Sequence, residues 1–169
     1  LLDEAKCQLY AEADYHGEAA HLTHFRALLA DRPDFLLPEV QETLSNVNIL
    51  AMSHVEGEPV EALAKASQAE RDRVVGLLFE LLFREIFEFR LVQTDPNFAN
   101  YRYDAAQGRL VLLDFGATRA YRMPVVDAYR RLITAAVAGN RAAMSAAAQA
   151  IGYFKAGIAE RQRDNVLDI

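Results

Sequence analysis

The chain has 169 residues, which is the size of one domain. Hydrophobic residues make up 52% and charged residues 25%, the balance of an ordinary globular protein, which excludes a disordered chain. The net charge of −6 argues against binding nucleic acid through its phosphates, and the single Cys7 excludes an internal disulfide and any multi-cysteine zinc site.

Two helices are predicted at the start of the chain. Residues 3–30 have the composition and apolar spacing of a helix. We expect Asp14–Gly17 to interrupt it, because Gly17 weakens a helix interior, and a second helix to run over about Glu18–Leu29. The chain begins at Leu1 without an initiator Met and opens directly into this pattern. We therefore expect it to be a piece of a longer protein.

A linker and a hairpin are predicted next. Pro33 and Pro38 bracket the linker. The β-rich runs Val40–Leu44 and Ile49–Val55 flank a polar stretch that suits a hairpin turn. The turn-forming residues of Glu56–Pro59 then end the second strand.

A long helix and a second hairpin are predicted in the middle of the chain. The capping-box pattern of Ser67–Glu70 begins a helix that should run to about Phe89, and its wide apolar face indicates burial in a helical lobe. A polar loop over Gln93–Asn100 follows. The runs Tyr101–Tyr103 and Leu110–Leu113, separated by a turn, predict the hairpin.

The last third of the chain is predicted to be helical. Pro124 suits the first turn of one helix, because proline there removes no hydrogen bond. Asn140 is a good N-cap for a further helix that runs through Ala150.

One ordered set of polar residues carries chemistry. Asp95 lies in the loop after the long helix, Asn100 follows with four residues between, and Asp114 begins an Asp-Phe-Gly sequence at the end of an apolar strand. Phosphoryl transfer needs a carboxylate beside the attacking oxygen, and an amide oxygen with a second carboxylate to hold Mg²⁺ against the phosphates. The spacing predicts Asp95 and Asn100 on the same side of a cleft, with the hairpin returning Asp114 beside them. This is the order of catalytic loop and metal-binding strand in kinases.

Each of these motifs also has a structural interpretation. Asp95 and Asn97 could form a turn around Pro96, and Asp114 could simply end a strand. The three residues in this order and context favour the functional interpretation.

The wider sequence resembles the UbiB-type atypical protein-kinase-like family, which supports ubiquinone (coenzyme Q) biosynthesis. The resemblance covers about Glu4 to at least Tyr129, and the Gln-Thr-Asp-Pro-Asn form of Gln93–Asn97 looks like its mitochondrial branch and close bacterial relatives. The segments that carry it are Glu12–Tyr15, Glu18–Ala20, Gln93–Asn100 and Leu112–Arg119. It implies an α+β protein-kinase-like fold, with the end of an N-lobe over residues 1–55 and a mostly helical C-lobe over residues 56–169.

The resemblance also implies roles for individual residues. Asp95 matches the catalytic acid, and Asn100 and Asp114 match the metal ligands. Glu18 matches the helix glutamate that pairs with a nucleotide-binding lysine. The hinge that offers backbone groups to adenine matches Met52, Ser53, His54 and Val55, and the family's Glu-x-Asp motif near the nucleotide matches Glu12 and Asp14. From the residues alone, Glu12, Asp14 and Glu18 could be solvated helix charges, and Met52 could fill the core.

The implied activity is that of an ATP-dependent kinase-like enzyme or ATPase in ubiquinone biosynthesis, with ATP and Mg²⁺ as cofactors. The short stretch from Gly116 to Pro124 leaves no room for a long activation segment, which argues for a lipid-like substrate or net ATP hydrolysis over protein phosphorylation. Two alternatives remain open. One is a small-molecule phosphotransferase of the aminoglycoside or choline kinase type, and the other is a nucleotide-sensing scaffold of a biosynthetic complex.

The sequence also bears on partners and location. No Gly-rich phosphate loop or lysine-bearing strand precedes the first helix, and Lys6 lies within it, so we expect this chain alone to bind Mg·ATP weakly or not at all. The family implies ubiquinone-precursor lipids and biosynthetic complex proteins as partners. It also implies work in the cytoplasm or on the matrix side of the mitochondrial inner membrane, with peripheral membrane contact. Four arginines that could cluster toward anionic lipid are Arg84, Arg90, Arg130 and Arg131.

Overall fold

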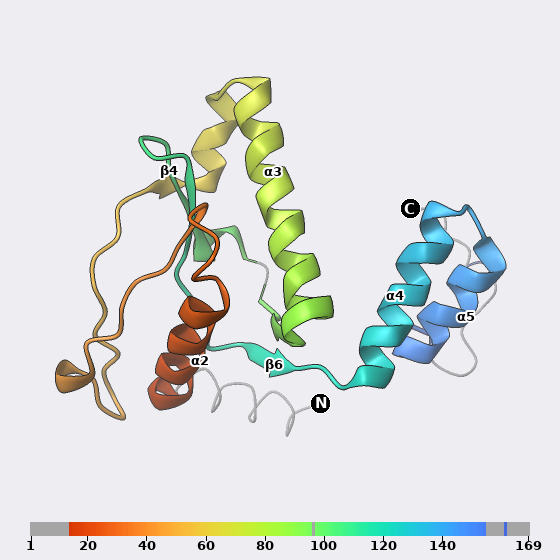
Figure 1. Ribbon diagram of the computed structural model, residues 1–169, viewed down its shortest axis with the longest axis horizontal. Helices are drawn as coiled ribbons and strands as arrows, with labels where there is room; N and C mark the ends of the chain where they lie inside the picture. The colour runs from red at the N-terminus through yellow and green to blue at the C-terminus, as the bar shows by residue number, and fades with distance from the viewer. Residues whose placement is uncertain (1–13, 96, 155–160, 162–169) are drawn as a thin grey trace.

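The computed structural model describes residues 14–95, 97–154 and 161 (Figure 1). The predicted helix over residues 3–13, which includes Glu12, lies outside the described residues. The α-helices are α2 (Tyr15–Leu28), α3 (Gln68–Phe83), α4 (Met123–Val137) and α5 (Arg141–Ile151). Three short 3₁₀ helices are η1 (Glu42–Leu44), η2 (Val60–Lys65) and η4 (Phe98–Asn100), and a π-helix, η3 (Arg84–Phe89), continues α3.

Side-chain caps fix where three of these helices begin. Ser67 Oγ accepts from the Glu70 N–H at 3.2 Å, and Asn140 Oδ1 accepts from the Ala143 N–H at 3.0 Å, so both predicted starts are confirmed. Pro124 lies in the first turn of α4, also as predicted.

The predicted second helix is confirmed as α2, but it begins earlier than expected and includes Gly17. Asp14 caps α2, and its Oδ1 accepts from the Gly17 N–H at 3.0 Å, so the helix begins three residues before Glu18. A Cβ on Gly17 would lie 2.7 Å from Asp14 Oδ2. Glycine therefore makes room for the cap instead of breaking the helix.

Two small sheets surround the predicted catalytic loop. The first has the order β1-β5-β4-β2, and the second pairs β3 with β6. Their strands are β1 (Phe35–Leu36), β2 (Glu58–Pro59), β4 (Tyr101–Asp104) and β5 (Arg109–Leu112) in the first sheet, and β3 (Leu91–Gln93) and β6 (Thr118–Ala120) in the second. The predicted hairpin is confirmed as the antiparallel β4–β5 pair, with Tyr101 opposite Leu112.

The other strand predictions need correction. The predicted linker contains β1, which pairs in parallel with β5 through Phe35 and Leu110. Glu58–Pro59, predicted to end a strand, forms the edge strand β2, where a proline removes no ladder hydrogen bond. The three-residue strands β3 and β6 were not predicted, because so short a segment has no readable period.

The first predicted hairpin, over 40–55, is much reduced. Val40 and Met52 form one bridge between its arms, Asn46 and Ile49 form a second bridge at its turn, and Glu42–Leu44 is a 3₁₀ turn. Ser45 Oγ donates to the Gln41 carbonyl and accepts from the Ala51 N–H, both at 3.0 Å. This side chain takes over the backbone groups that a longer ladder would use.

One hydrophobic core joins α2, α3 and the first sheet. Its members come from elements on both sides of residue 55, and they include Leu22, Phe25, Leu29, Phe35, Val74, Leu77, Leu81, Leu110, Leu112 and Phe115. The α4–α5 pair stands to one side of this body, beyond β6 (Figure 1). Among the described residues, no helix combines the length and apolar character needed to cross a membrane.

Candidate functional site

The predicted catalytic loop brings its two polar residues into contact. The long helix ends at Arg90, whose φ of 56° lies in the left-handed region, and β3 then leads directly to Asp95. The Asn100 Nδ2 donates to the Asp95 carbonyl and to the Asp95 Oδ2, each at 3.2 Å. The turn interpretation also holds for Asn97, whose Oδ1 accepts from the Ala99 N–H at 3.0 Å and caps η4.

The hairpin returns Asp114 to this loop. The Leu113 N–H donates to the Asn100 carbonyl at 3.1 Å, and the Asp114 Oδ1 accepts from the Gly116 N–H at 2.9 Å. Between them, the Phe115 ring is 2% exposed and lies 4.7 Å from the Phe25 ring of α2. The Asp-Phe-Gly turn is thus held to both the catalytic loop and α2.

Glu18 lies beside the same turn. Its carboxylate accepts from the Phe115 N–H, while burial and the neighbouring Asp114 carboxylate raise the pKa of Glu18. A Cβ on Gly116 would lie 3.5 Å from Asp114 Oδ1 and 3.8 Å from Glu18 Oε2, so the two carboxylates border one point. Glu18 is half-buried at the turn, unlike a solvated helix charge.

The donor set fits a magnesium ion. Asn100 uses its Nδ2 toward Asp95, which leaves its Oδ1 as an acceptor, and Asp114 uses one carboxylate oxygen toward Gly116. Carboxylate and amide oxygens are the hard ligands that Mg²⁺ prefers, and a cation here would offset the repulsion between Asp114 and Glu18. In the described ranges no group of three His, Cys, Asp or Glu residues could hold a metal by itself. Mg²⁺ sites in proteins usually include substrate phosphates and water among their ligands.

The predicted hinge segment presents backbone groups from one residue. The Gln41 N–H donates to the Ala51 carbonyl and the Ser53 N–H to the Glu39 carbonyl, both at 2.8 Å. In this antiparallel pattern the N–H and C=O of Met52 point away from residues 39–41. The Met52 side chain packs against the core, so the core-filling interpretation of that side chain is confirmed.

The remaining predicted residues that the structure describes are Ser53, His54, Val55 and Asp14. Ser53 Oγ accepts from the Glu39 N–H at 2.8 Å, which ties the serine to the neighbouring segment. His54 is exposed and Val55 is half-buried. Asp14 is the N-cap of α2, a structural role that its sequence context did not single out.

One buried residue and one half-buried residue of the site were not predicted. Glu85 is 4% exposed, and burial raises its pKa to about 8 although the Gln93 N–H donates to its carboxyl group. Burial, with the nearby Glu85 and Asp95 carboxylates, likewise raises the pKa of Tyr101 to about 12. The available signal was the position of Glu85, an acid four residues after Leu81 on an otherwise apolar helix face.

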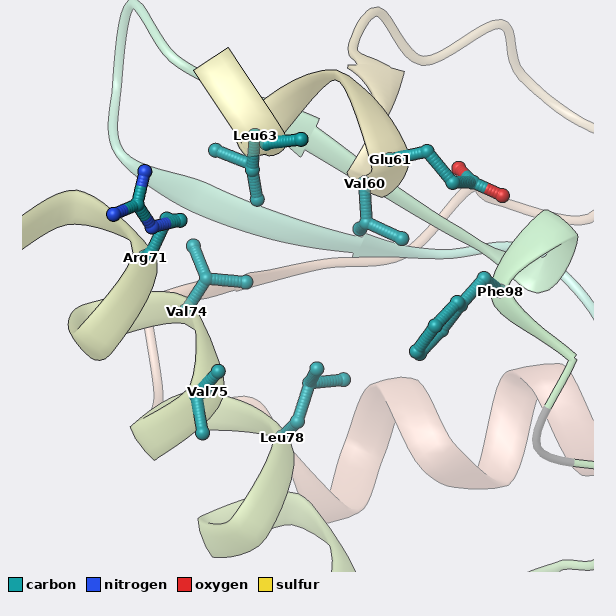
Figure 2. Close-up of a pocket in the computed structure, with 9 residues that line it drawn as sticks. Val60, Glu61, Leu63, Arg71, Val74, Val75, Leu78 and Phe98 are labelled. Carbon is teal, nitrogen blue, oxygen red and sulfur yellow. The ribbon is translucent and has the colours of Figure 1, made fainter. Parts of the chain in front are cut away.

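An apolar cavity of about 250 Å³ adjoins the catalytic loop. Figure 2 shows Val60 and Leu63 of η2 facing Val74 and Leu78 of α3 across it, with the Phe98 ring of the catalytic loop at one end. Phe98 is 57% exposed. The cavity could accept an apolar group beside Phe98 of the catalytic loop.

Comparison with known proteins gives a consistent result. Residues 1–148 match the ABC1 atypical kinase-like domain. The chain is 39% identical to the atypical kinase coq-8 of Caenorhabditis elegans over 89% of its length and 20% of that protein, and 42% identical to rat COQ8B over 79% and 25%. It is 34% identical to COQ8 of Saccharomyces cerevisiae over 97% of its length and 33% of that protein. All three relatives are named as mitochondrial.

A solved structure agrees with the fold. Rv3197 of Mycobacterium tuberculosis, in complex with erythromycin, superposes with a TM-score of 0.72 at 26% identity, covering 94% of this chain and 40% of that one. A probable protein kinase UbiB of Cellvibrio japonicus is 26% identical over 59% of this chain. The chain spans a fifth to a third of the length of the three curated mitochondrial relatives. Its α+β architecture is protein-kinase-like, and the chain belongs to the ABC1 atypical kinase-like domain family, the UbiB and COQ8 group.

Proposed function

We propose that this chain forms the catalytic part of an ATP-dependent kinase-like enzyme or ATPase that supports ubiquinone biosynthesis. The observation that carries the proposal is the contact of Asn100 with Asp95, joined to the hairpin through the Leu113 N–H. These bonds gather three polar residues that phosphoryl transfer requires. The relatives named as COQ8 and UbiB kinases support the same activity.

Each residue has a defined task in this proposal. Asp95, whose side chain is exposed to solvent, orients the attacking hydroxyl or water. Asn100 and Asp114 hold Mg²⁺, which supplies positive charge to the phosphate oxygens when bound. The outward N–H and C=O of Met52 bind the adenine edge. Glu18 stays at the Asp-Phe-Gly turn through the Phe115 N–H and there fixes the position of Asp114.

The acceptor in this proposal is a lipid-like ubiquinone precursor. The apolar cavity beside Phe98 supports it, because a prenyl chain requires an apolar surface near the reacting group. Net ATP hydrolysis is the variant in which water takes the acceptor's place. ATP turnover with and without the lipid separates the two.

The proposal places the protein at the surface of the inner membrane, on the matrix side in a eukaryote, among other biosynthetic proteins. Of the four arginines predicted to face lipid, Arg84 bonds to Glu88 and Arg130 to Asp127. Lipid contact would therefore draw on Arg90 and Arg131 more than on the paired arginines. Sedimentation with anionic vesicles, compared between the parent and a variant lacking both, tests this point.

Substitution of Asp114 tests the activity. In the full-length protein, Asp114→Asn removes a charge from the metal site and should abolish ATP turnover, whereas Asp127→Asn, half-buried in α4 and paired with Arg130, should leave turnover unchanged. Retained turnover in D114N would contradict the assignment. A parent protein that binds Mg·ATP without turnover would instead favour a nucleotide-sensing scaffold.

A further inference from the structure

A buried polar cluster lies beneath the Asp95–Asn100 loop, and the proposed function gives it no task. Glu85 comes from η3 and is 4% exposed, and Gln93 comes from β3 and is 9% exposed. The backbone N–H of Gln93 donates to the Glu85 carboxyl group. Both side chains line a small cavity whose other walls include Asn100 and Asp114. The cluster therefore borders the two proposed metal ligands.

Gln93 carries polar atoms that need a partner. Within the described ranges, its Nε2 and Oε1 are buried and make no hydrogen bond, and the same holds for Thr118 Oγ1. Gln93 and Thr118 are directly opposite each other in the β3–β6 pair, so their side chains project from the same face of that ladder. A buried amide without a partner costs about 1–3 kcal/mol. A molecule that forms hydrogen bonds with this amide would therefore bind tightly.

The cavity has the size and chemistry of a site for one water molecule. Its volume is about 10 Å³. That is about the volume one water needs, and a buried water requires two to four polar partners. The polar residues that line it are Glu85, Gln93, Asn100, Tyr101 and Asp114, and an organic ligand would be too large.

We propose that Glu85 and Gln93 form a buried site for one ordered water, which positions Asn100 and Asp114 from beneath the catalytic loop. The inference rests on the proposed function in one respect, namely that Asn100 and Asp114 hold the metal. The water restrains the Asn100 side chain, whose Nδ2 already donates to Asp95. Glu85 and Gln93 are thus positioning residues, and groups of this kind behind metal ligands change metal affinity by about 10–100-fold.

The water itself is tested without metal or nucleotide. In ¹⁵N-labelled chain, the Gln93 side-chain amide should show a cross-peak to a long-lived water in nuclear Overhauser spectra. Gln93→Met keeps length and burial but removes the amide, so it should make the Asn100 side-chain amide exchange faster with solvent. Gln107→Met, in the exposed β4–β5 turn, is the matched control and should leave that exchange unchanged.

Metal affinity provides the second readout. In the full-length protein, Mn²⁺ binding, followed by electron paramagnetic resonance, should weaken by about tenfold or more in Q93M and stay within about twofold of the parent in Gln107→Met. If the full-length parent binds no Mn²⁺, the proposed function is contradicted, while the water cross-peak and the Asn100 exchange still decide the inference.

Three results would overturn the inference. The first is the absence of a water cross-peak at Gln93 in the parent, a measurement that does not depend on any variant folding. The second is unchanged Asn100 exchange in folded Q93M. The third is a Gln93 amide that responds to Thr118→Val without any water signal, because its partner would then be the hydroxyl group opposite.

Discussion

The buried Glu85 carboxyl group should make the folded chain less stable as pH rises, and Glu85→Gln should remove this pH dependence. Burial raises the pKa of Glu85 from 4.5 to about 8. A carboxyl group with a higher pKa in the folded chain holds its proton more tightly there, so the free energy of unfolding falls as pH rises between these two values. The loss is complete above the folded pKa and absent below the unfolded one.

The two pKa values fix the magnitude. One pKa unit corresponds to about 1.4 kcal/mol, so from about pH 5 to about pH 7 the parent should lose about 2.5 kcal/mol relative to E85Q. For a chain of this length the unfolding midpoint would shift by about 5–10 °C. The Gln amide oxygen can still accept from the Gln93 N–H, so the variant changes the charge and keeps the hydrogen bond.

Urea denaturation of both proteins at four pH values between about 5 and 8 measures this difference. Glu88→Gln is the matched control. Glu88 lies in the same π-helix but is exposed, and the hydrogen bond from Arg84 lowers its pKa. Its stabilisation is lost only as pH falls through that lowered value, so the control should be flat over the range tested. If the free energy of unfolding changes equally with pH in E85Q and the parent from about pH 5 to about pH 8, Glu85 is ionised in the folded chain and the reasoning from burial is refuted.

Three further substitutions test packing, capping and the apolar cavity. Phe115→Leu loses the ring contact with Phe25 and should lower the free energy of unfolding, measured by urea denaturation, by about 1–2 kcal/mol. Phe79→Leu, on the exposed face of α3, should change it by less than about 0.5 kcal/mol. Equal effects of the two substitutions would contradict the core assignment. Asn140→Ala removes the cap of α5 and should cost about 1 kcal/mol, seen as faster amide exchange confined to α5, and exchange that rises equally in α3 would count against it. Phe98→Ala should barely change the free energy of unfolding but should raise the half-saturating concentration of a prenylated substrate by about tenfold. An unchanged half-saturating concentration would exclude this cavity as the prenyl site.

The site was largely predictable where local chemistry determines the backbone. The fixed spacing between Asp95 and Asn100, with a hairpin of clear alternation behind it, predicted the contacts that the loop makes. The caps at Ser67 and Asn140 are likewise local, because each side chain bonds to a backbone group three residues away.

What could not be predicted depends on contacts between distant segments. The long helix was expected to run to Phe89 as one α-helix, and its extent is right, but its last six residues form the π-helix η3. Apolar periodicity does not distinguish an α-helix from a π-helix, and the buried Glu85 lies in the π-helical segment. The edge strands β1 and β2 arise because β4 and β5 offer them backbone partners from elsewhere in the sequence.

Helix α2 grips the Asp-Phe-Gly turn at two points. Glu18 accepts from the Phe115 N–H, and Phe25, seven residues later and two turns along the same face, packs on the Phe115 ring. Advancing the helix by one residue would rotate that face by about 100° and translate it by about 1.5 Å, which would break both contacts with Phe115. A rotation of α2 about its axis would therefore displace the Asp-Phe-Gly turn, and Asp114 would move with it.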